Sequence, residues 1–243
     1  MAMDTVLVTG VAGFIGSAVA RALLGQGRRV VGIDNLSDYY DVRLKRFRLT
    51  DLQAQDDFQF VELDIEKQAA IDEVFVENSI QSVFHFAARA GVRYSIEHPH
   101  VYLTTNVIGS LNIFEAMAQH GVKKCIMASS SSLYAGHDGP FEETLSVNRP
   151  VSPYAASKKA MELLAYSYHH LHQLDLSILR YFTVYGPAGR PDMSPYRFTK
   201  WIAEGTPLTI YGDGMQSRDF TYISDVVQAT LAAERPLGYE IIN

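Results

Sequence analysis

Three glycines spaced three residues apart lie between a short apolar run and an apolar segment of helical periodicity near the start of the chain. The apolar run is Thr5–Thr9, and the glycines are Gly10, Gly13 and Gly16. Glycine has no Cβ, so a backbone rich in it can turn sharply and let a ligand approach closely. A helix that begins at such a turn presents free N–H groups and its positive dipole end, both of which favour anions. The pattern therefore predicts a strand–turn–helix unit that binds the pyrophosphate of a dinucleotide.

Short apolar runs alternate with segments of helical periodicity up to about residue 181. The runs typical of strands are Thr5–Thr9, Arg29–Asp34, Phe58–Glu62, Ser82–Phe86, Lys124–Ala128 and Leu176–Arg180. Helical periodicity falls between them, near residues 14–26, 44–53, 66–78, 100–120 and 154–172. Continuous apolar strands separated by helices indicate a parallel sheet that helices cover on both faces. We therefore predict an α/β fold, a doubly wound parallel sheet of the Rossmann type.

The pattern changes after about residue 181, where prolines and glycines break the chain into short pieces. Strand-like runs remain at Leu208–Tyr211 and Tyr239–Ile242, and we expect helices near residues 195–204 and 224–234. Residues 1–182 are expected to form a nucleotide-binding Rossmann domain. Residues 183–243 are expected to form a smaller substrate-binding cap, with segments that return to the core sheet.

Composition excludes several classes of partner. The 243 residues carry 27 acidic and 21 basic side chains, a net charge of −6, whereas nucleic acid and anionic membranes call for a basic face. The single cysteine, Cys125, rules out an internal disulfide framework and indicates a reducing compartment. The sequence also lacks a signal-peptide pattern and any run of 18 residues apolar enough to span a bilayer, so we expect a cytoplasmic protein. The histidines at 169, 170 and 172 lack the spacing of a helical zinc site, and we expect no metal.

Asp34 ends the second predicted strand, 18 residues after Gly16. A carboxylate at this place in a dinucleotide-binding unit accepts hydrogen bonds from the adenosine ribose hydroxyls. Its negative charge also repels a 2′-phosphate, so the sequence favours NAD over NADP as the cofactor. Asp64 and Ile65 follow the third predicted strand and are candidates to flank the adenine. Glycines that serve a tight turn without any cofactor are the alternative interpretation.

Tyr154 and Lys158 lie four residues apart at the start of a predicted helix, so they share one face of it. A nearby ammonium stabilises a phenolate, and an oxidised nicotinamide would add a second positive charge. Both charges are expected to lower the pKa of the tyrosine from about 10 toward neutrality. Tyr154 is therefore a candidate general base for a sugar hydroxyl, although an ordinary amphipathic helix can carry the same pair.

Four consecutive serines, Ser129 to Ser132, follow the fifth predicted strand. Open α/β sheets bind their ligands at the carboxyl ends of the strands. The four hydroxyls can therefore bind a hydroxyl or carboxylate of a substrate, and a plain serine-rich turn is the alternative.

Several longer strings carry a resemblance to a known family. They are Thr9–Gly16, Asp34-Asn35, His85–Ser95, Ser129–Tyr134, Tyr154-x-x-x-Lys158, Arg180–Pro187, Gly189–Met193 and Arg218–Tyr222. With these strings the chain resembles the extended short-chain dehydrogenases/reductases and, more narrowly, the NAD-dependent nucleotide-sugar epimerases of the UDP-glucuronate 4-epimerase type. The glycine turn and the Tyr-Lys pair indicate only the superfamily, whereas Ala-Gly-Val-Arg-Tyr-Ser and Gly-Arg-Pro-Asp-Met are the narrower signals.

The resemblance implies a role for each matching position. The implied catalytic residues are Ser130, Tyr154 and Lys158, with the serine helping the tyrosine to hold the sugar 4-hydroxyl. The candidate cofactor-binding residues, from the turn and from the resemblance together, are Gly10, Gly13, Phe14, Ile15, Gly16, Asp34, Asn35, Asp64, Ile65, Phe86, Ala87, Ala88, Asn106, Tyr154, Lys158, Tyr181 and Val184. The implied substrate-binding residues are Arg93, Ser130, Ser131, Thr183, Arg190 and Arg218. Of these, Thr183 and Arg190 are candidates for a glycosyl carboxylate and Arg218 for the nucleotide phosphates, because arginine binds such anions through a planar donor fork.

The implied reaction is epimerisation at C4 of a nucleotide sugar, UDP-glucuronate to UDP-galacturonate, by hydride transfer to bound NAD and return through a 4-keto intermediate. Related dehydratases carry an Asp-Glu pair where this chain has Ser131 and Ser132, and decarboxylases carry a glutamate in place of Ser132. Both reactions are therefore less favoured. UDP-glucose 4-epimerisation, UDP-glucuronate decarboxylation and NAD binding without turnover remain the alternatives.

Two further expectations follow from the same resemblance. Similar proteins continue beyond the equivalent of Asn243, so we expect the cap of this chain to be truncated at its C-terminal end. The helices near residues 100–120 and 154–172 are expected to pair with their copies in a homodimer. Simple packing against the sheet is the alternative for these helices.

Overall fold

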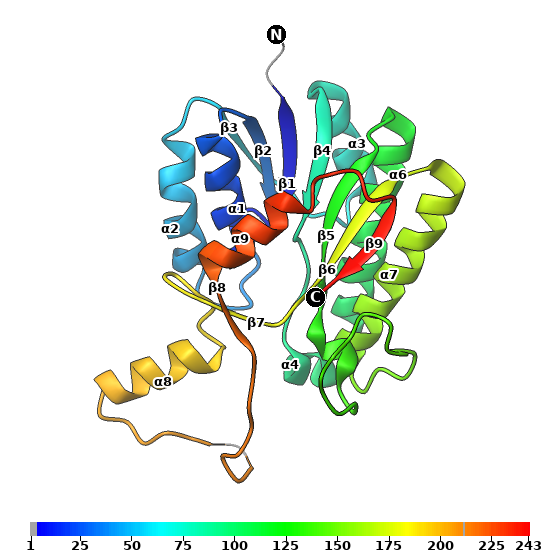
Figure 1. Ribbon diagram of the computed structural model, residues 1–243. Coiled ribbons are helices and arrows are strands. Elements are labelled where there is room, and N and C mark those ends of the chain that lie inside the picture. The colour runs from blue at the N-terminus through cyan, green and yellow to red at the C-terminus, as the bar shows by residue number, and fades with distance from the viewer. Residues whose placement is uncertain (1–3, 211) are drawn as a thin grey trace.

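The computed structural model describes residues 4–210 and 212–243, and a parallel sheet lies at the centre of this part of the chain (Figure 1). Its seven strands have the order β3-β2-β1-β4-β5-β6-β9. They are β1 (Thr5–Thr9), β2 (Arg29–Asp34), β3 (Phe58–Glu62), β4 (Ile80–His85), β5 (Lys124–Ser130), β6 (Asp175–Tyr181) and β9 (Tyr239–Ile242). The chain starts in mid-sheet, winds outward to β3, and then continues on the other side of β1. This is the doubly wound order of a Rossmann sheet, so the predicted fold class is confirmed.

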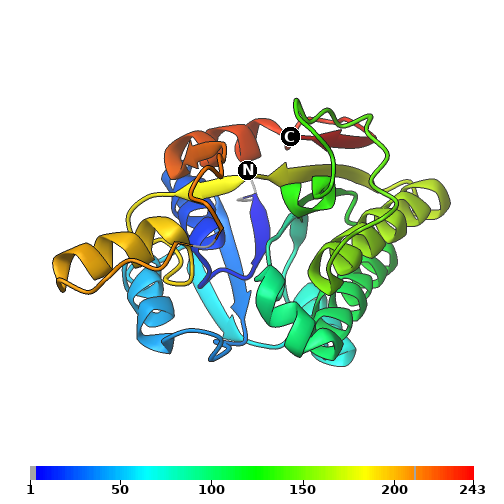
Figure 2. The ribbon, with the colours of Figure 1, turned by 90° about the horizontal axis from the view of Figure 1, so that it is seen from below.

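Helices cover both faces of the sheet, as Figure 2 shows along its edge. One face carries α1 (Phe14–Gly25), α2 (Val42–Gln53) and α9 (Ile223–Ala232), and the other carries α3 (Gln68–Glu77), α6 (Gly109–His120) and α7 (Pro153–His172). In β1, Val6 and Val8 pack into the core of the first face and Leu7 packs into the core of the second. A strand buried on both faces has no polar alternation, and this is why the strands appear in the sequence as continuous apolar runs.

The predicted strand Leu208–Tyr211 is wrong over its described part. Residues 208–210 have no regular structure, and Leu208 and Ile210 are 42% and 60% exposed. Tyr211 lies outside the described residues. An apolar run becomes a strand only where another strand pairs with it. The pairing in this region instead joins β7 (Thr183–Tyr185) and β8 (Phe220–Tyr222), which are too short to show a pattern in the sequence.

The segment predicted as one helix over residues 100–120 is divided. It consists of α5 (Pro99–Tyr102), a π-helical turn η1 (Leu103–Ile108) and α6. Two short helices were not predicted, α4 (Val92–Glu97) and the 3₁₀ turn η2 (Ser131–Tyr134). π-turns within helices are frequent at functional sites. Here the π-turn carries a buried asparagine, Asn106, that supports the pocket described below.

The last part of the chain divides between the layers and a projection. The helix α8 (Ser194–Ala203) and the segment that leads to β8 extend away from the three layers (Figure 1). The chain then returns through α9, and β9 pairs in parallel with β6, from Leu176 opposite Tyr239 to Leu179 opposite Ile242. Over the described ranges, no helix is long and apolar enough to cross a membrane.

Candidate active site

A pocket of about 700 Å³ opens at the carboxyl ends of the strands that meet in the middle of the sheet. Its walls come from the turn after β1, the ends of β2, β4, β5 and β6, the start of α7, and the loop that precedes α8. This is the place where open α/β sheets bind ligands, and the volume is ample for a small-molecule site.

The glycine turn forms one wall, and each glycine there has a steric reason. Gly10 has a φ of +68°, and a Cβ on it would lie 2.7 Å from the amide nitrogen of Ala87. A Cβ on Gly13 would lie 2.9 Å from the carbonyl oxygen of Gly10, and one on Gly16 would overlap that oxygen. The helix α1 begins here with Gly13 at its N-cap and no side-chain cap. The backbone N–H groups of its first turn are thus available to an anion, which fits the pyrophosphate of NAD.

Asp34 lies in the wall beside this turn and is held in place by main-chain donors. Its carboxylate accepts hydrogen bonds from the amides of Ala12 (3.1 Å) and Leu36 (2.8 Å). Lys45 Nζ lies 3.4 Å from Asp34 Oδ1 and is itself in the pocket wall. Burial lowers the pKa of the Lys45 ammonium, and the nearby Asp34 charge offsets only part of this shift. The Asp34 carboxylate faces the pocket, as the ribose hydroxyls of NAD require.

Of the residues predicted near the adenine, some line the pocket and one does not. Asn35 and Ile65 line the pocket, but Asp64 does not. Asp64 instead accepts a hydrogen bond from the side-chain amide of Asn35 (2.8 Å) and another from the amide of Glu66 (3.0 Å). These bonds orient the Asn35 side chain, and a contact of Asp64 with the adenine stays a prediction.

The segment after β4 forms the floor of the same half of the pocket. Phe86, Ala87 and Ala88 line it, as predicted. Thr9 Oγ1 accepts hydrogen bonds from the amides of Phe86 (3.1 Å) and Ala87 (3.0 Å), which ties this segment to β1. Asn106 was expected to line the cofactor, but its side chain is fully buried behind the wall.

Asn106 holds the wall from behind. Its side chain accepts from the amide of Arg89 (2.7 Å) and donates to the carbonyl of Arg89 (3.0 Å) and to the hydroxyl of Ser157 (2.9 Å). The prediction that Asn106 itself faces the pocket is wrong, because these three bonds use its polar atoms for the backbone and for α7.

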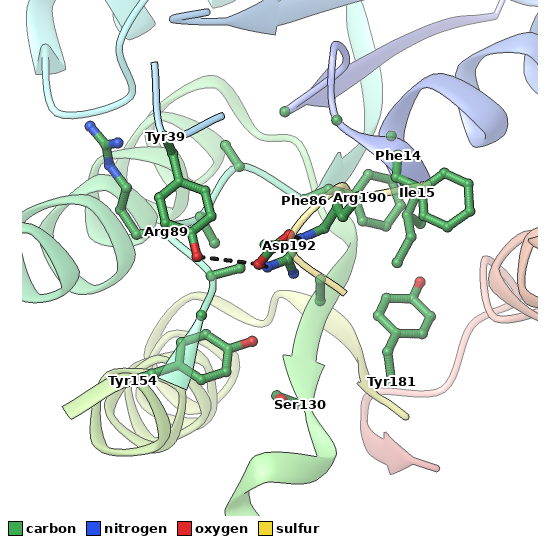
Figure 3. A pocket seen from close by; sticks show the side chains of 18 of the residues that line it. Phe14, Ile15, Tyr39, Phe86, Arg89, Ser130, Tyr154, Tyr181, Arg190 and Asp192 are labelled. Atoms are coloured by element: carbon green, nitrogen blue, oxygen red, sulfur yellow. Dashed lines mark hydrogen bonds and ion pairs between the residues drawn. The ribbon is translucent and has the colours of Figure 1, made fainter. Parts of the chain in front are cut away.

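The three implied catalytic side chains meet at one end of the pocket. Ser130 ends β5, Tyr154 lies in the first turn of α7, and Lys158 follows one turn later, and all three line the pocket. The helix begins where it does because Ser152 caps it, accepting from the amide of Ala155 (3.1 Å), and Pro153 follows the cap. Figure 3 shows Tyr154 and Ser130 facing the same space, with Tyr181 on the far side of Ser130 in this view.

The pKa of Tyr154 is not lowered by Lys158 in the way that the sequence predicts. Burial raises the pKa of Tyr154 above its usual 10.0, although a hydrogen bond from Ser130 and the Arg190 charge both lower it. Burial also lowers the pKa of Lys158 to about 7, against the charge of Glu162. The expected lowering of the tyrosine pKa by Lys158 is therefore not provided by the protein alone, because desolvation of the phenolate outweighs the neighbouring charges.

A buried ion pair supports this end of the pocket from below. Arg180 and Glu162, each 1% exposed, form two hydrogen bonds of 2.9 and 2.8 Å. Ser129 also donates to Glu162 (2.7 Å), and Arg180 donates to the hydroxyl of Tyr134 (2.7 Å). With these bonds the pair joins β6 to β5 and α7, the two elements that carry the implied catalytic side chains.

Most of the implied substrate-binding residues lie on the remaining wall. Arg93, Ser131, Thr183 and Arg190 line the pocket together with Tyr181 and Val184. Arg190 is paired with Asp192, through Nε to Oδ1 (3.1 Å) and Nη2 to Oδ2 (2.5 Å).

Tyr39 donates to the same Asp192 carboxylate over 3.2 Å, and Figure 3 shows the three side chains together above Tyr154. Burial raises the pKa of Tyr39 to about 12. Its hydroxyl therefore stays protonated near neutral pH and keeps its hydrogen bond to Asp192.

Arg218 does not reach this pocket. It is exposed on the segment between α8 and β8, and its guanidinium donates to the carbonyl of Ser217 (2.6 Å). Arg218 therefore does not line this pocket, and its contact with nucleotide phosphates stays a prediction.

Other pocket residues were missed by the sequence reasoning. They are Ile33, Ser37, Tyr39, Tyr40, Lys45, Leu63, Arg89, Ala90, Gly91, Val92, Tyr94, Glu97, Thr105, Ala128, Asp192, Met193 and Arg197. Several belong to strings quoted for the resemblance, such as Asp192 in Gly-Arg-Pro-Asp-Met. Lys45 and Tyr39 follow β2 in a polar stretch with no motif, and only the fold brings them to the site. Across the described residues, no group of three His, Cys, Asp or Glu side chains could hold a metal ion.

This arrangement fits a nucleotide-dependent enzyme, and comparisons with known proteins identify its class. The NAD dependent epimerase/dehydratase family matches residues 6–243, and the chain belongs to this family. A UDP-glucuronate 4-epimerase of Thermodesulfobacterium geofontis is 56% identical over 241 residues, which are 99% of this chain and 75% of that protein. A probable UDP-glucuronate 4-epimerase of Rhizobium meliloti is 45% identical over 224 residues, 92% of this chain and 66% of its own length.

Solved structures agree with this assignment. The UDP-glucuronic acid 4-epimerase of Bacillus cereus in complex with UDP-glucuronic acid and NAD is similar with a TM-score of 0.91 and 39% identity. The match covers 98% of this chain and 76% of that chain. A UDP-glucose 4-epimerase of Thermotoga maritima with UDP-glucose is similar with a TM-score of 0.84 and 34% identity, over 95% of this chain and 73% of that one.

Proposed function

We propose that this chain catalyses epimerisation at C4 of a nucleotide sugar, with UDP-glucuronate and UDP-galacturonate as the pair that it interconverts. The observation that carries the proposal is one pocket in which Ser130, Tyr154 and Lys158 lie opposite the Arg190 guanidinium. The first three residues suit proton transfer at a sugar hydroxyl, and the last suits a sugar carboxylate. The similarity to UDP-glucuronate 4-epimerases supports the same assignment.

The glycine-lined half of the pocket is proposed to hold NAD. Its pyrophosphate would lie on the N-terminus of α1, its adenosine ribose against Asp34, and its nicotinamide end toward Tyr181 and Val184. Ile65 and Asn35 would flank the adenine, and Phe14, Ile15, Phe86, Ala87 and Ala88 would pack along the cofactor. When bound there, NAD supplies a reversible hydride acceptor for C4 of the sugar, and the protein supplies binding, orientation and proton transfer.

Tyr154 is the proposed base and acid for the 4-hydroxyl. Ser130 would hold that hydroxyl against the phenol, and its hydrogen bond lowers the pKa of Tyr154. Lys158 is fixed beneath the tyrosine and would hold the ribose next to the nicotinamide. Because burial raises the pKa of Tyr154, the base needs further positive charge at the site before it can take the proton near neutral pH.

Arg190 and Thr183 are the proposed ligands of the uronate carboxylate, with Ser131 and Arg93 nearby in the same wall. The oxidised sugar is a β-keto acid, which loses CO₂ readily if its carboxylate rotates freely. A guanidinium that binds the carboxylate in a fixed orientation keeps it from leaving. Ser132 stands where decarboxylases of the family resemblance carry a glutamate, which further favours epimerisation.

A neutral-sugar epimerase is the second candidate, because the similarity to UDP-glucose 4-epimerases extends over nearly the whole chain. The proton and hydride chemistry would be identical, and only the residues at the C5 substituent would differ. The partly buried fork of Arg190 in the pocket wall favours the acid sugar over the neutral one.

Incubation of the protein with NAD⁺ and UDP-glucuronate, with the product identified by NMR, tests the proposal. UDP-galacturonate as the product supports it. UDP-xylose or an accumulating 4-keto sugar would establish a decarboxylase or an oxidase instead, and turnover of UDP-glucose alone would establish the second candidate. NAD binding in calorimetry without turnover of either sugar would leave a cofactor-binding protein that is not an enzyme.

Three coarser features complete the proposal. The part up to residue 182 acts as the NAD domain and the rest as a substrate-binding cap, apart from α9 and β9, which support the sheet. The faces of η1 and α7 that expose Leu103, Leu163 and Tyr166 at 51%, 58% and 56% are proposed to pack against a second copy in a homodimer. The protein is proposed to act in the cytoplasm, where nucleotide sugars and NAD are at hand.

A further inference from the structure

We propose that Arg48, a residue of α2 outside the pocket wall, is a positioning residue that sets the place of Arg190 and so the selectivity for an acid sugar. The inference rests on the proposed function, since it concerns how the carboxylate-binding arginine is held. It adds a residue to that function that neither the motifs nor the pocket lining indicates.

The Arg48 guanidinium joins two loops that are far apart in the chain. On one side, Nη1 donates to the carbonyl oxygen of Ala12 (3.0 Å), in the middle of the glycine turn, and to the hydroxyl of Tyr40 (2.6 Å). On the other side, Nε and Nη2 both donate to the carbonyl oxygen of Ala188, over 3.0 and 2.8 Å. Nη2 also lies 3.4 Å from the carbonyl oxygen of Gly189. One side chain thus connects the dinucleotide turn to the loop that carries Arg190.

The Arg48 guanidinium is buried, so it loses its hydration when the protein folds. The residue is 3% exposed, and its acceptors are main-chain carbonyls and a phenol rather than carboxylates. Among the ion pairs between described residues, none includes Arg48. A buried guanidinium without a counter-charge is tolerated only when its donors are satisfied. The planar fork supplies several donors in fixed directions, which the single ammonium of a lysine cannot reproduce.

The loop at Ala188, to which Arg48 donates, contains a strained backbone conformation that other contacts must stabilise. Ala188 has a φ of +56°, a left-handed conformation that is unfavourable for a residue with a Cβ. The turn is closed by a hydrogen bond from the amide of Gly189 to the carbonyl of Gly186 (3.1 Å). A strained residue of this kind persists where its surroundings fix it. The two bonds from Arg48 to the Ala188 carbonyl provide that constraint.

Arg190 follows Ala188 by two residues, so a shift of this loop moves the guanidinium that faces Tyr154. Asp192 holds Arg190 from the far side, through the 3.1 and 2.5 Å contacts described above. Arg48 and Asp192 therefore fix the loop at its two ends. The structure assigns to Arg48 the end that is attached to the cofactor turn.

The test compares Arg48→Lys with Arg21→Lys in the NAD-loaded protein. Arg21 is a matched control because its exposed side chain also reaches α2, through an ion pair of 3.2 Å with Asp51. Calorimetry with UDP-glucuronate is expected to show about tenfold weaker binding to Arg48→Lys, and no change for Arg21→Lys. Binding of UDP-glucose, which has no carboxylate, is expected to change less than about threefold. NAD content should stay as in the wild type, because the turn is also fixed by the Gly10 amide to Ile33 (2.7 Å) and the Ala12 amide to Asp34.

Two further measurements separate a positioning role from a general loss of structure. Hydrogen exchange should become faster at residues 186–190 in Arg48→Lys and stay unchanged in the sheet. In Arg48→Ala, added guanidinium should restore UDP-glucuronate binding, whereas the same concentration of urea should not.

Equal losses for both sugar nucleotides, or no loss of UDP-glucuronate binding, would overturn the proposal. If the wild type turned over neither sugar, the proposed function would fail instead. The exchange rates at residues 186–190 would still show whether Arg48 holds the loop.

Discussion

Lys158 Nζ donates a hydrogen bond to the main-chain carbonyl oxygen of Ala128 over 2.8 Å. The donor is on α7 and the acceptor on β5, so the bond ties the helix that carries Tyr154 to the strand that ends at Ser130. Burial lowers the pKa of this amine to about 7, and the Glu162 carboxylate opposes part of the shift. Perturbed groups of this kind concentrate at functional sites, where the fold accepts a loss of stability.

We expect Lys158→Met to stabilise the fold at low pH and to remove turnover. The pKa of the amine is about 7 in the folded protein, against its usual 10.5. Between these values the unfolded chain holds the proton and the folded chain does not, so the folded wild type gains stability as the pH rises. Methionine does not titrate. The stability advantage of the variant is therefore largest below pH 7 and shrinks by about 1.4 kcal/mol per pH unit above it.

Urea unfolding of both proteins at several pH values between about 6 and 9.5 measures this difference. Turnover of UDP-glucuronate should fall by at least about 100-fold in the same variant. Lys200→Met, at a lysine that is 53% exposed on α8, serves as the control and should leave both quantities near the wild type. A free-energy difference between Lys158→Met and wild type that is the same at every pH would contradict the prediction.

Tyr154→Phe should lower kcat by about 10³-fold while NAD and UDP-glucuronate remain bound. The variant loses the hydroxyl that transfers the proton and keeps the ring, which packs edge-on against Tyr102 with the centroids 6.0 Å apart. Rapid-quench kinetics measures kcat, and calorimetry on the same preparation measures the binding of NAD and UDP-glucuronate. A variant that keeps most of its kcat would remove Tyr154 from the role of base.

Ser130→Ala should move the pH dependence of the reaction. Burial raises the pKa of Tyr154, and the hydrogen bond of Ser130 is the second cause and lowers it. Without that bond the pKa of Tyr154 rises further, so the rate should climb at a higher pH than in the wild type. The measurement is kcat/KM against pH. An unchanged profile with a uniformly lower rate would show that Ser130 binds the sugar without acting on the tyrosine.

Arg190→Met should discriminate between acid and neutral sugars. The lost charge-assisted hydrogen bonds are worth about 2 kcal/mol, so kcat/KM for UDP-glucuronate should fall by roughly 10- to 100-fold. UDP-glucose binding should change far less, since it offers no carboxylate to the fork. Arg43→Met, at an arginine that is 90% exposed, is the control. Equal losses for the two substrates would remove Arg190 from the carboxylate role.

The sheet could be predicted because its inner strands are buried on both faces, and only the edge strands β3 and β9 are partly exposed. β1, β2 and β3 have the predicted bounds, and β4, β5 and β6 differ by one or two residues at their ends. The short pair β7 and β8 could not be predicted, because three-residue strands carry no periodicity and their pairing spans 35 or more residues of chain. The run at Leu208 resembles a strand in sequence, but its described residues, 208–210, pair with no strand.

The site could be predicted where its residues sit at the ends of strands or inside a motif. Gly10, Asp34 and Ser130 are of this kind, since a strand end in a parallel sheet points to one common edge. Lys45, in the pocket wall, and Arg48, behind it, are not, because both project from the buried face of a helix with a polar sequence. Asn106 was expected in the pocket wall and lies behind it, because a motif shows that a polar residue matters without showing which atoms it contacts.

His85 is expected to make the fold sensitive to acid. It is 1% exposed, and burial lowers its pKa from 6.5 to about 3. The hydroxyl of Thr9 accepts from two amides, so its own proton must go to His85 Nδ1 (2.7 Å). Nε2 then carries the ring proton and donates to Ser110 (2.8 Å), which donates to the carbonyl of Asn106 (2.6 Å). A second ring proton, on Nδ1, would point at the proton of the Thr9 hydroxyl, and the two donors would repel each other.

Between pH 6.5 and 3 the unfolded chain takes up a proton at His85 and the folded chain does not, so stability falls as the pH falls. The loss due to this residue is about 1.4 kcal/mol per pH unit within the window. Carboxylates add to the total loss, and a pair of variants isolates the contribution of the histidine. His85→Gln removes the titration, so the free energy of unfolding should fall less steeply from about pH 6 to pH 4 than in the wild type.

Ser110→Ala is the matched control for His85→Gln. It removes one partner of the ring and lowers stability by about 1 to 3 kcal/mol, but it keeps the buried histidine and therefore the full pH slope. Urea unfolding of the three proteins at the same pH values gives the slopes. If His85→Gln follows the wild type in parallel over this range, the acid sensitivity lies elsewhere in the molecule, and the neutral ring between Thr9 and Ser110 is not its source.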